Sequence, residues 1–138
     1  LQHDMDATGF GYEPGQVPRV DTLSFQADKG LIGLAKDCCS RVNPDINTFV
    51  GRVVSGDQFI SDKAKKEWLV KTFQGYCTEM EGAAIAQACY LNGIPFLIVR
   101  AISDKADDSA SVDYPAFEAQ AIGHSVNLLT EMIRCYEE

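Results

Sequence analysis

The sequence lacks the basic surplus that proteins use to bind nucleic acids or anionic membranes. Its 12 Lys and Arg residues are outnumbered by 20 Asp and Glu residues, which gives a net charge of −8. Binding to phosphate backbones or anionic lipids depends on clustered cations. The single basic cluster, "KAKK" at 63–66, has the spacing of a solvated helix face. We therefore expect neither a nucleic acid nor a membrane as a partner.

The sequence also lacks paired cysteines and long apolar runs. Its five cysteines are an odd set without a CxxC pair or a nearby histidine at ligand spacing: Cys38, Cys39, Cys77, Cys89 and Cys135. This pattern predicts neither a disulfide framework nor a metal site. No run approaches the roughly 18 apolar residues that span a bilayer, and no signal sequence opens the chain. We expect a soluble, cytoplasmic protein.

The pattern of apolar residues predicts one α/β domain over residues 1–138. With 46% hydrophobic and 23% charged residues among 138, the chain can bury a core. Periodicity and breakers predict helices over 28–41, 61–73 and 81–92, a last helix after the loop 104–113, and strands over 47–55, 76–80 and 95–103. The run "PFLIVRAIS" (95–103) does not alternate, which is typical of a strand covered on both faces in a parallel or mixed sheet.

Two further expectations concern the helices. Ser61 or Asp62 is the expected cap of the helix over 61–73. The last helix should present one apolar stripe, formed by Phe117, Ala121, Ile122, Leu128, Leu129, Met132 and Ile133.

Polar and aromatic residues follow the predicted strands at their carboxyl ends, where ligands bind in such sheets. These residues are Asp57, Phe59, Glu79, Glu81, Ser103 and Asp104. Arg100 lies inside the apolar run, where an unpaired guanidinium would cost several kcal/mol. It needs a carboxylate partner, and Glu79 is the nearest candidate.

Each of these residues also has a purely structural interpretation. Arg100 and Glu79 can be a structural ion pair. Glu81 can be a first-turn acid that the helix dipole favours by about 0.3–1 kcal/mol. Asp104 can be a loop or cap residue. The convergence of three strand ends on one edge of the sheet favours the functional interpretation. His3 and His124 are expected to be structural or surface residues.

Four motifs carry a resemblance to a known family. They are "HDMDATGFGYEPGQ" (3–16), "VSGDQFI" (54–60), "EMEGAAIA" (79–86) and "VRAISDKAD" (99–107). In this order and spacing they resemble the bacterial 5′-methylthioadenosine/S-adenosylhomocysteine nucleosidases, within the purine nucleoside phosphorylase superfamily. The resemblance implies a three-layer αβα fold with a mixed central sheet, and hydrolysis of an N-glycosidic bond that releases adenine.

The resemblance also implies roles for residues of this chain. Phe59 stacks on adenine, and the backbone at Ile60 bonds the base edge. Met80 packs beneath the sugar, and Glu81 holds the ribose hydroxyls. Other matching positions are Asp104 as the acid at N7 with Ser103 orienting it, Glu79 and Arg100 near the attacking water, and Tyr114 at the 5′-alkylthio pocket, where the family usually has Phe.

The chemistry accounts for these residue types. Adenine is a poor leaving group until it is protonated, and the sugar becomes cationic as the bond breaks. An acid at N7 contributes about 10²- to 10⁴-fold, and a carboxylate beside the sugar stabilises the developing charge. Neither a metal nor an organic cofactor is required.

The family's chain is longer at its amino end, where its general base and first strands lie. The resemblance therefore implies that residues 1–138 are the carboxyl-terminal part of the domain. We expect this part alone to be weakly active or inactive unless an amino-terminal segment is supplied. The usual partner in the family is a second copy, forming a homodimer. A phosphorylase of the same superfamily and a non-catalytic nucleoside-binding fragment remain alternatives.

Overall fold

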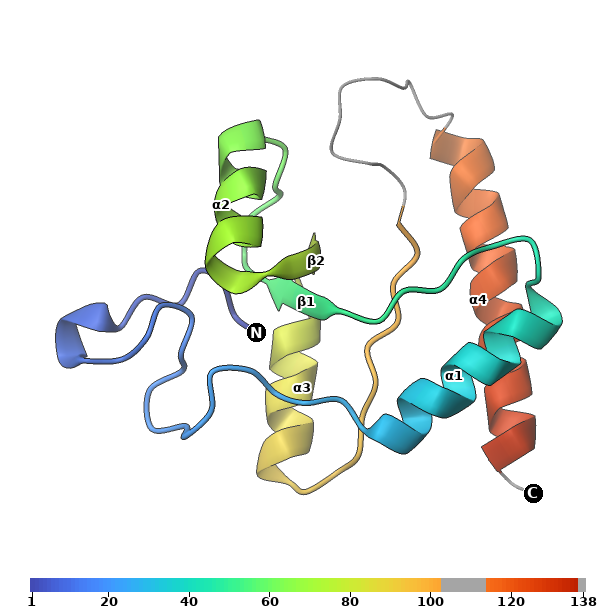
Figure 1. The fold of residues 1–138 in the computed structure, drawn as a ribbon, viewed down its shortest axis with the longest axis horizontal. Coiled ribbons are helices and arrows are strands. Elements are labelled where there is room, and N and C mark those ends of the chain that lie inside the picture. The colour runs from blue at the N-terminus through green and yellow to red at the C-terminus, as the bar shows by residue number, and fades with distance from the viewer. Residues whose placement is uncertain (103–113, 137–138) are drawn as a thin grey trace. The chain divides into compact units, whose positions relative to one another are not determined.

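The computed structural model describes residues 1–102 and 114–136 of the chain. Two compact units make up the chain. Unit 1 comprises residues 1–27 and 51–98, and unit 2 comprises residues 28–50 and 99–138. Figure 1 shows the elements of both units. The α/β class predicted from the sequence is confirmed, since helices alternate with parallel strands.

Unit 1 is built on a β-α-β arrangement. Strands β1 (Arg52–Ser55) and β2 (Gly75–Glu79) are parallel and are connected by helix α2 (Lys63–Phe73). A parallel pair needs such a crossover because its strands run in the same direction. Helix α3 (Gly82–Leu91) follows β2 directly, and the short 3-10 helix η1 (Thr8–Phe10) lies near the start of the chain.

The core of unit 1 forms between β1 and α2. Val54, Leu69 and Phe73 are at most 3% exposed and cluster together, with Ile60 packed against them. Full burial of such side chains contributes about 1.5–3 kcal/mol each. Helix α3 packs on β1 and buries Ala83 and Ala86, so its small residues permit a close approach to the sheet.

The helix ends follow the sequence signals. Asp62 is the N-cap of α2, and its carboxylate accepts a hydrogen bond of 2.7 Å from the N–H of Lys65. This confirms one of the two predicted caps. Asp28 caps α1 (Lys29–Val42) in the same way through Leu31, at 2.8 Å. After α3 the chain turns at Gly93, whose φ of 64° suits glycine.

Unit 2 consists of the pair α1 and α4 (Tyr114–Tyr136), whose core contains Cys38, Cys39 and Leu128. The prediction of one apolar stripe on α4 is wrong in part. Met132 packs against this core, but Ile122, Leu129 and Ile133 are between 54% and 61% exposed. A single helix can bury only the face that contacts its neighbour, so the other half of the predicted stripe is left in solvent.

Two predicted strands differ from the structure. The first is confined to Arg52–Ser55, so residues 47–51 are not part of it. Over residues 94–102 there is no strand at all, although residues 95–103 were predicted to form one. A strand exists through its hydrogen bonds to a neighbouring strand. Within the described ranges, no strand pairs with this segment.

Candidate functional site

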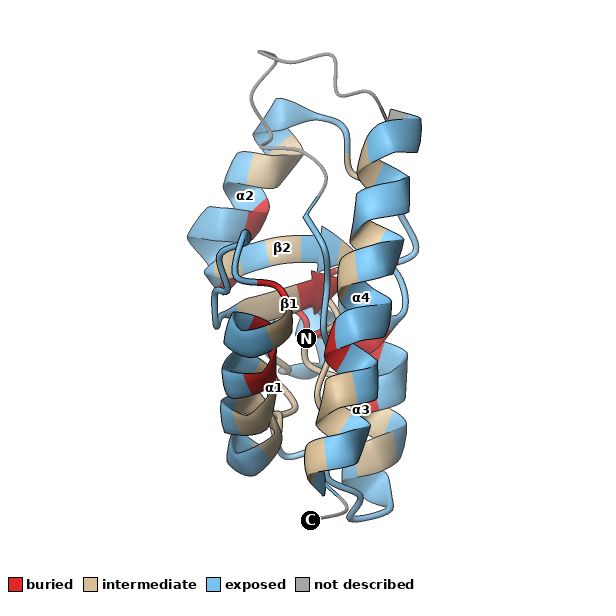
Figure 2. Ribbon diagram, turned by 90° about the vertical axis from the view of Figure 1, so that its right-hand side faces the viewer, coloured by how far each residue is buried: buried red, intermediate tan, exposed pale blue. Residues whose placement is uncertain are grey.

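The carboxyl ends of β1 and β2 lie side by side in unit 1. The register pairs Ser55 of β1 with Glu79 of β2. The loop 56–60 follows β1, and Met80 and Glu81 follow β2, so both predicted motifs reach the same end of the sheet. Figure 2 shows buried residues on β1, whereas the residues of β2 are exposed or of intermediate burial. This is the edge at which α/β sheets bind ligands.

Glu79 is fixed at the amino terminus of α3. Its carboxylate accepts hydrogen bonds from the N–H of Glu81 at 3.1 Å, from the N–H of Gly82 at 2.7 Å and from the hydroxyl of Ser55. The Ser55 oxygen in turn accepts the N–H of Ala83 at 2.8 Å. A carboxylate is stabilised here because the helix presents unpaired N–H groups and the positive end of its dipole.

Glu81 joins this network through its backbone N–H, which donates to Glu79. It is the N-cap residue of α3, yet its side chain makes no capping hydrogen bond. The carboxylate of Glu79 occupies that position instead. The interpretation of Glu81 as an acid that merely supports the helix end is thereby weakened, and its exposed side chain follows the carboxyl end of β2.

The loop 56–60 presents an aromatic ring to solvent. Phe59 is 87% exposed, whereas the next residue, Ile60, packs against the core of unit 1. Met80, on the other strand end, is 45% exposed. Exposed large apolar side chains at a ligand-binding edge are typical of a surface that binds an apolar or aromatic group.

The amino-terminal stretch holds this loop in place, which sequence reasoning missed. Asp4 accepts a hydrogen bond of 2.6 Å from the N–H of Asp57, and the backbone N–H of His3 donates to the carbonyl of Ser55 at 2.7 Å. Burial opposes ionisation of Asp4, but its hydrogen bonds from Asp57 and Gln2 outweigh that effect and lower its pKa. The sequence carried no residue-level signal for this role beyond the motif at 3–16.

His3 is 2% exposed, and its ring lies against Gly56. Both ring nitrogens are without a hydrogen-bond partner among the described residues. Burial lowers the pKa of His3, while the nearby Asp4 carboxylate partly opposes this effect. The expectation of a structural histidine fits this position. His124, in unit 2, lies 3.1 Å from Asp45 through Nε2.

The other predicted site residues belong elsewhere in the chain. Arg100 is in unit 2 and is exposed, so the prediction that its guanidinium is buried is wrong. The neighbouring Val99 and Ile102 are also 47% and 58% exposed, which removes the desolvation penalty behind that prediction. Tyr114 begins α4. Ser103 and Asp104 lie outside the described residues, and their roles stay predictions.

Two kinds of feature are absent from residues 1–102 and 114–136. No group of three or more His, Cys, Asp and Glu residues in these ranges is arranged to hold a metal ion. No helix of the same ranges has the length and hydropathy needed to cross a membrane.

One sequence relative and two solved structures that are similar to this chain carry the same enzyme name. The 5′-methylthioadenosine/S-adenosylhomocysteine nucleosidase of an Exiguobacterium species is 38% identical over 99% of this chain and 58% of its own length. The crystal structure of the Campylobacter jejuni nucleosidase of the same name has a TM-score of 0.85 at 34% identity, covering 96% of this chain and 56% of that one. The Neisseria meningitidis nucleosidase, in complex with methylthio-immucillin-A, has a TM-score of 0.84 at 36% identity, covering 97% and 58%.

These comparisons confirm the resemblance that the four motifs indicated. The chain spans 58% of the Exiguobacterium relative, so a large part of such proteins has no counterpart in these residues. The sequence-family model described as "Phosphorylase superfamily" matches residues 1–134. The chain therefore belongs to the phosphorylase superfamily.

Proposed function

We propose that the protein hydrolyses the N-glycosidic bond of 5′-methylthioadenosine and S-adenosylhomocysteine, releasing adenine and a 5′-thio-ribose. The observation that carries this proposal is the edge of the sheet in unit 1, where Phe59 and Glu81 are both exposed and the side chain of Glu81 makes no capping hydrogen bond. The sequence similarity to nucleosidases of this specificity supports the same substrate class.

In this proposal unit 1 binds the nucleoside. Phe59 stacks on the adenine, and the backbone of Ile60 bonds the base edge. Met80 packs beneath the sugar, and Glu81 accepts hydrogen bonds from the ribose hydroxyls. The Neisseria relative binds an adenine nucleoside analogue, which supports a ligand with these two parts.

The chemical step requires a proton at the base and a water at the sugar. Asp104 is the proposed acid at N7, with Ser103 orienting it. Protonation makes adenine a better leaving group, and the negative charge of Glu81 stabilises the cationic sugar. Glu79 and Arg100 act near the attacking water, and Tyr114 contributes to the pocket for the 5′ substituent.

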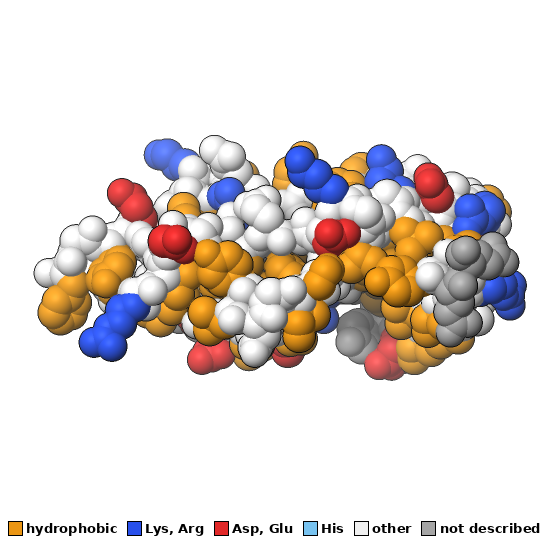
Figure 3. Space-filling model, turned by 90° about the horizontal axis from the view of Figure 1, so that it is seen from below, with side chains coloured by type: hydrophobic (Ala, Val, Ile, Leu, Met, Phe, Trp, Pro, Cys, Tyr) orange, Lys and Arg blue, Asp and Glu red, His pale blue; other side chains and the backbone are white. Residues whose placement is uncertain are grey.

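We further propose that an amino-terminal segment completes the domain and supplies the general base. Large apolar side chains remain exposed in both units, including Ile85 at 52%, Ile102 at 58% and Ile122 at 59%. Figure 3 shows hydrophobic side chains among those exposed at the surface. With that segment present, residues 95–103 would pair as a strand of a mixed sheet within a three-layer αβα fold. By family resemblance, the complete protein acts in methionine salvage in the cytoplasm, as a homodimer.

Substitution of the proposed acid tests this assignment. Asp104→Asn in the complete protein should reduce turnover of 5′-methylthioadenosine by about 10²- to 10⁴-fold. Binding of the nucleoside should change far less, because the proton is needed chiefly as the bond breaks. Asp108→Asn, outside the four motifs, is the matched control and should retain turnover. Unchanged turnover in Asp104→Asn would remove this residue from the acid role.

The alternatives give different results in the same assay. A phosphorylase would need phosphate for release of the base. A nucleoside-binding protein without catalysis would bind 5′-methylthioadenosine but release no adenine. Either result would replace the proposed hydrolase.

A further inference from the structure

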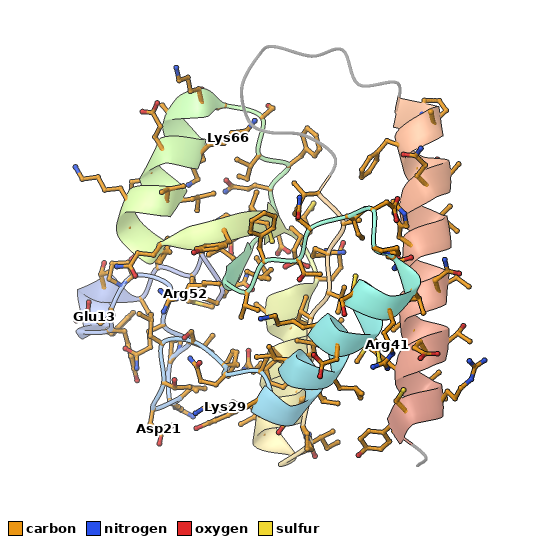
Figure 4. The ribbon with its side chains drawn as sticks, turned by 45° about the vertical axis from the view of Figure 1, so that its right-hand side comes forward. Glu13, Asp21, Lys29, Arg41, Arg52 and Lys66 are labelled. Atoms are coloured by element: carbon orange, nitrogen blue, oxygen red, sulfur yellow. The ribbon has the colours of Figure 1, made fainter. Side chains whose placement is uncertain are left out.

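Two thiols of unit 2 contact the same guanidinium group. Nη2 of Arg41 donates to Sγ of Cys38 at 3.3 Å and to Sγ of Cys135 at 3.0 Å. Figure 4 shows Arg41 on α1 next to α4. Cys135 also packs against the buried cluster that contains Cys38. We propose that Cys38 and Cys135 are a reversible oxidation site, at which a hydroperoxide converts the two thiols to a disulfide that joins α1 to α4.

The two thiols differ in accessibility, which sets the order of reaction. Cys38 is fully buried, and burial raises the pKa of its thiol, with the neighbouring Cys135 adding to this effect and Arg41 opposing it. Cys135 is only partly buried, so a small oxidant can reach it. A thiolate is the reactive form of cysteine, and a neighbouring cation stabilises it. Cys135 is therefore the thiol that reacts first.

The groups that face this pair on both helices are Arg41 and Glu131. Glu131 lies 3.8 Å from Sγ of Cys135 and 3.3 Å from Nε of Arg41. Arg134 lies 3.2 Å from the other oxygen of Glu131. Each oxygen of this carboxylate is thus paired with a guanidinium group.

The reaction balances with one hydroperoxide. With hydrogen peroxide, the thiolate of Cys135 attacks one oxygen, the O–O bond breaks, and a sulfenic acid and hydroxide form. The sulfur of Cys38 then attacks the sulfenic sulfur, the S–O bond breaks and the disulfide forms. The proton of Cys38 and the proton that Cys135 lost on becoming a thiolate combine with the two released hydroxides as two waters. Two thiols and one peroxide therefore give one disulfide and two waters.

Mass spectrometry of the complete protein tests this proposal. After mild treatment with hydrogen peroxide, the intact mass should fall by about 2 Da, and a reducing thiol should restore it. Peptide mapping should find Cys38 linked to Cys135. Cys38→Ser and Cys135→Ser should each abolish the link, whereas Cys89→Ser, on α3 of unit 1, should leave it unchanged.

A variant of Arg41 tests whether the guanidinium speeds the reaction or whether the proximity of the two sulfurs is sufficient. Arg41→Gln removes the cation but leaves both sulfurs, so formation of the disulfide should slow several-fold at neutral pH. Circular dichroism verifies that each variant is folded. A link from Cys135 to Cys39, or no disulfide in the folded wild-type protein, would overturn the proposal. An unchanged rate in Arg41→Gln would overturn the role of the guanidinium.

Discussion

Ser55 and Glu79 lie opposite each other at the carboxyl ends of the two strands, and the hydroxyl of Ser55 donates to the carboxylate of Glu79. Through this contact the end of β1 is joined to the amino terminus of α3, because both side chains also accept backbone N–H groups of that helix. One hydrogen-bonded pair thus fixes the strand ends from which both candidate binding motifs extend.

Substitution of Glu79, which caps α3, should change stability, whereas substitution of Glu81, the proposed ribose-binding residue, should change turnover. Glu79→Ala removes the acceptor of two helix N–H groups and should reduce the free energy of unfolding by about 0.5–2 kcal/mol. Glu81→Gln should change it by less than about 0.5 kcal/mol, since its side chain makes no capping hydrogen bond. Urea denaturation measures both. In turnover, Glu81→Gln should lose about 10²- to 10³-fold. A strongly destabilised Glu81→Gln protein would contradict this separation.

The exposed ring of Phe59 should matter for binding but not for folding. Because Phe59 is 87% exposed, Phe59→Ala should leave the free energy of unfolding within about 0.5 kcal/mol of wild type. Affinity for 5′-methylthioadenosine should fall, since base stacking on an aromatic ring is worth about 1–3 kcal/mol. Phe10→Ala is the matched control, because Phe10 is 88% exposed and lies on η1. Equal losses of affinity in both variants would argue against the stacking role.

Gly56 should tolerate no side chain. A Cβ at this position would overlap the buried imidazole of His3 and lie 2.9 Å from the carboxyl carbon of Asp4. Gly56→Ala should therefore destabilise the protein by about 1–3 kcal/mol. Gly33→Ala on α1 is the control, since a Cβ there meets nothing within 4 Å, and it should stabilise by about 0.4–1 kcal/mol. Thermal or urea unfolding distinguishes the two variants. A neutral Gly56→Ala would show that His3 can move away.

His3 should make stability depend on pH. Burial lowers the pKa of His3 in the folded protein, so the unfolded chain binds a proton more readily. The free energy of unfolding should therefore be highest above pH about 6.5 and fall as the pH drops below that value. His3→Gln should flatten this decline, and His124→Gln measures what the other histidine contributes. An identical decline in wild type and His3→Gln would exclude the buried imidazole as its cause.

The sequence predicted the helices well, because they depend on local signals. Apolar periodicity located α1 and α2, and Asp62 marked the start of α2. Each of these signals lies within the element it describes, so no distant part of the chain was needed.

Features that depend on distant partners could not be predicted in the same way. The apolar run at 95–103 has the composition of a central strand, but a strand requires a neighbour, and its described part has none. The burial of Arg100 was predicted from the same run, and this prediction was wrong for the same reason. The sequence also could not show which of two nearby carboxylates, Glu79 or Glu81, turns back onto the helix. That choice depends on the contact with Ser55.

The most direct test of the account is release of adenine from 5′-methylthioadenosine by the complete protein, measured with and without phosphate. The account predicts release at the same rate in both conditions, and little or none from residues 1–138 alone until the amino-terminal segment is added. Release that requires phosphate, or no release by the complete folded protein, would contradict a nucleosidase site built on Phe59, Glu81 and Asp104.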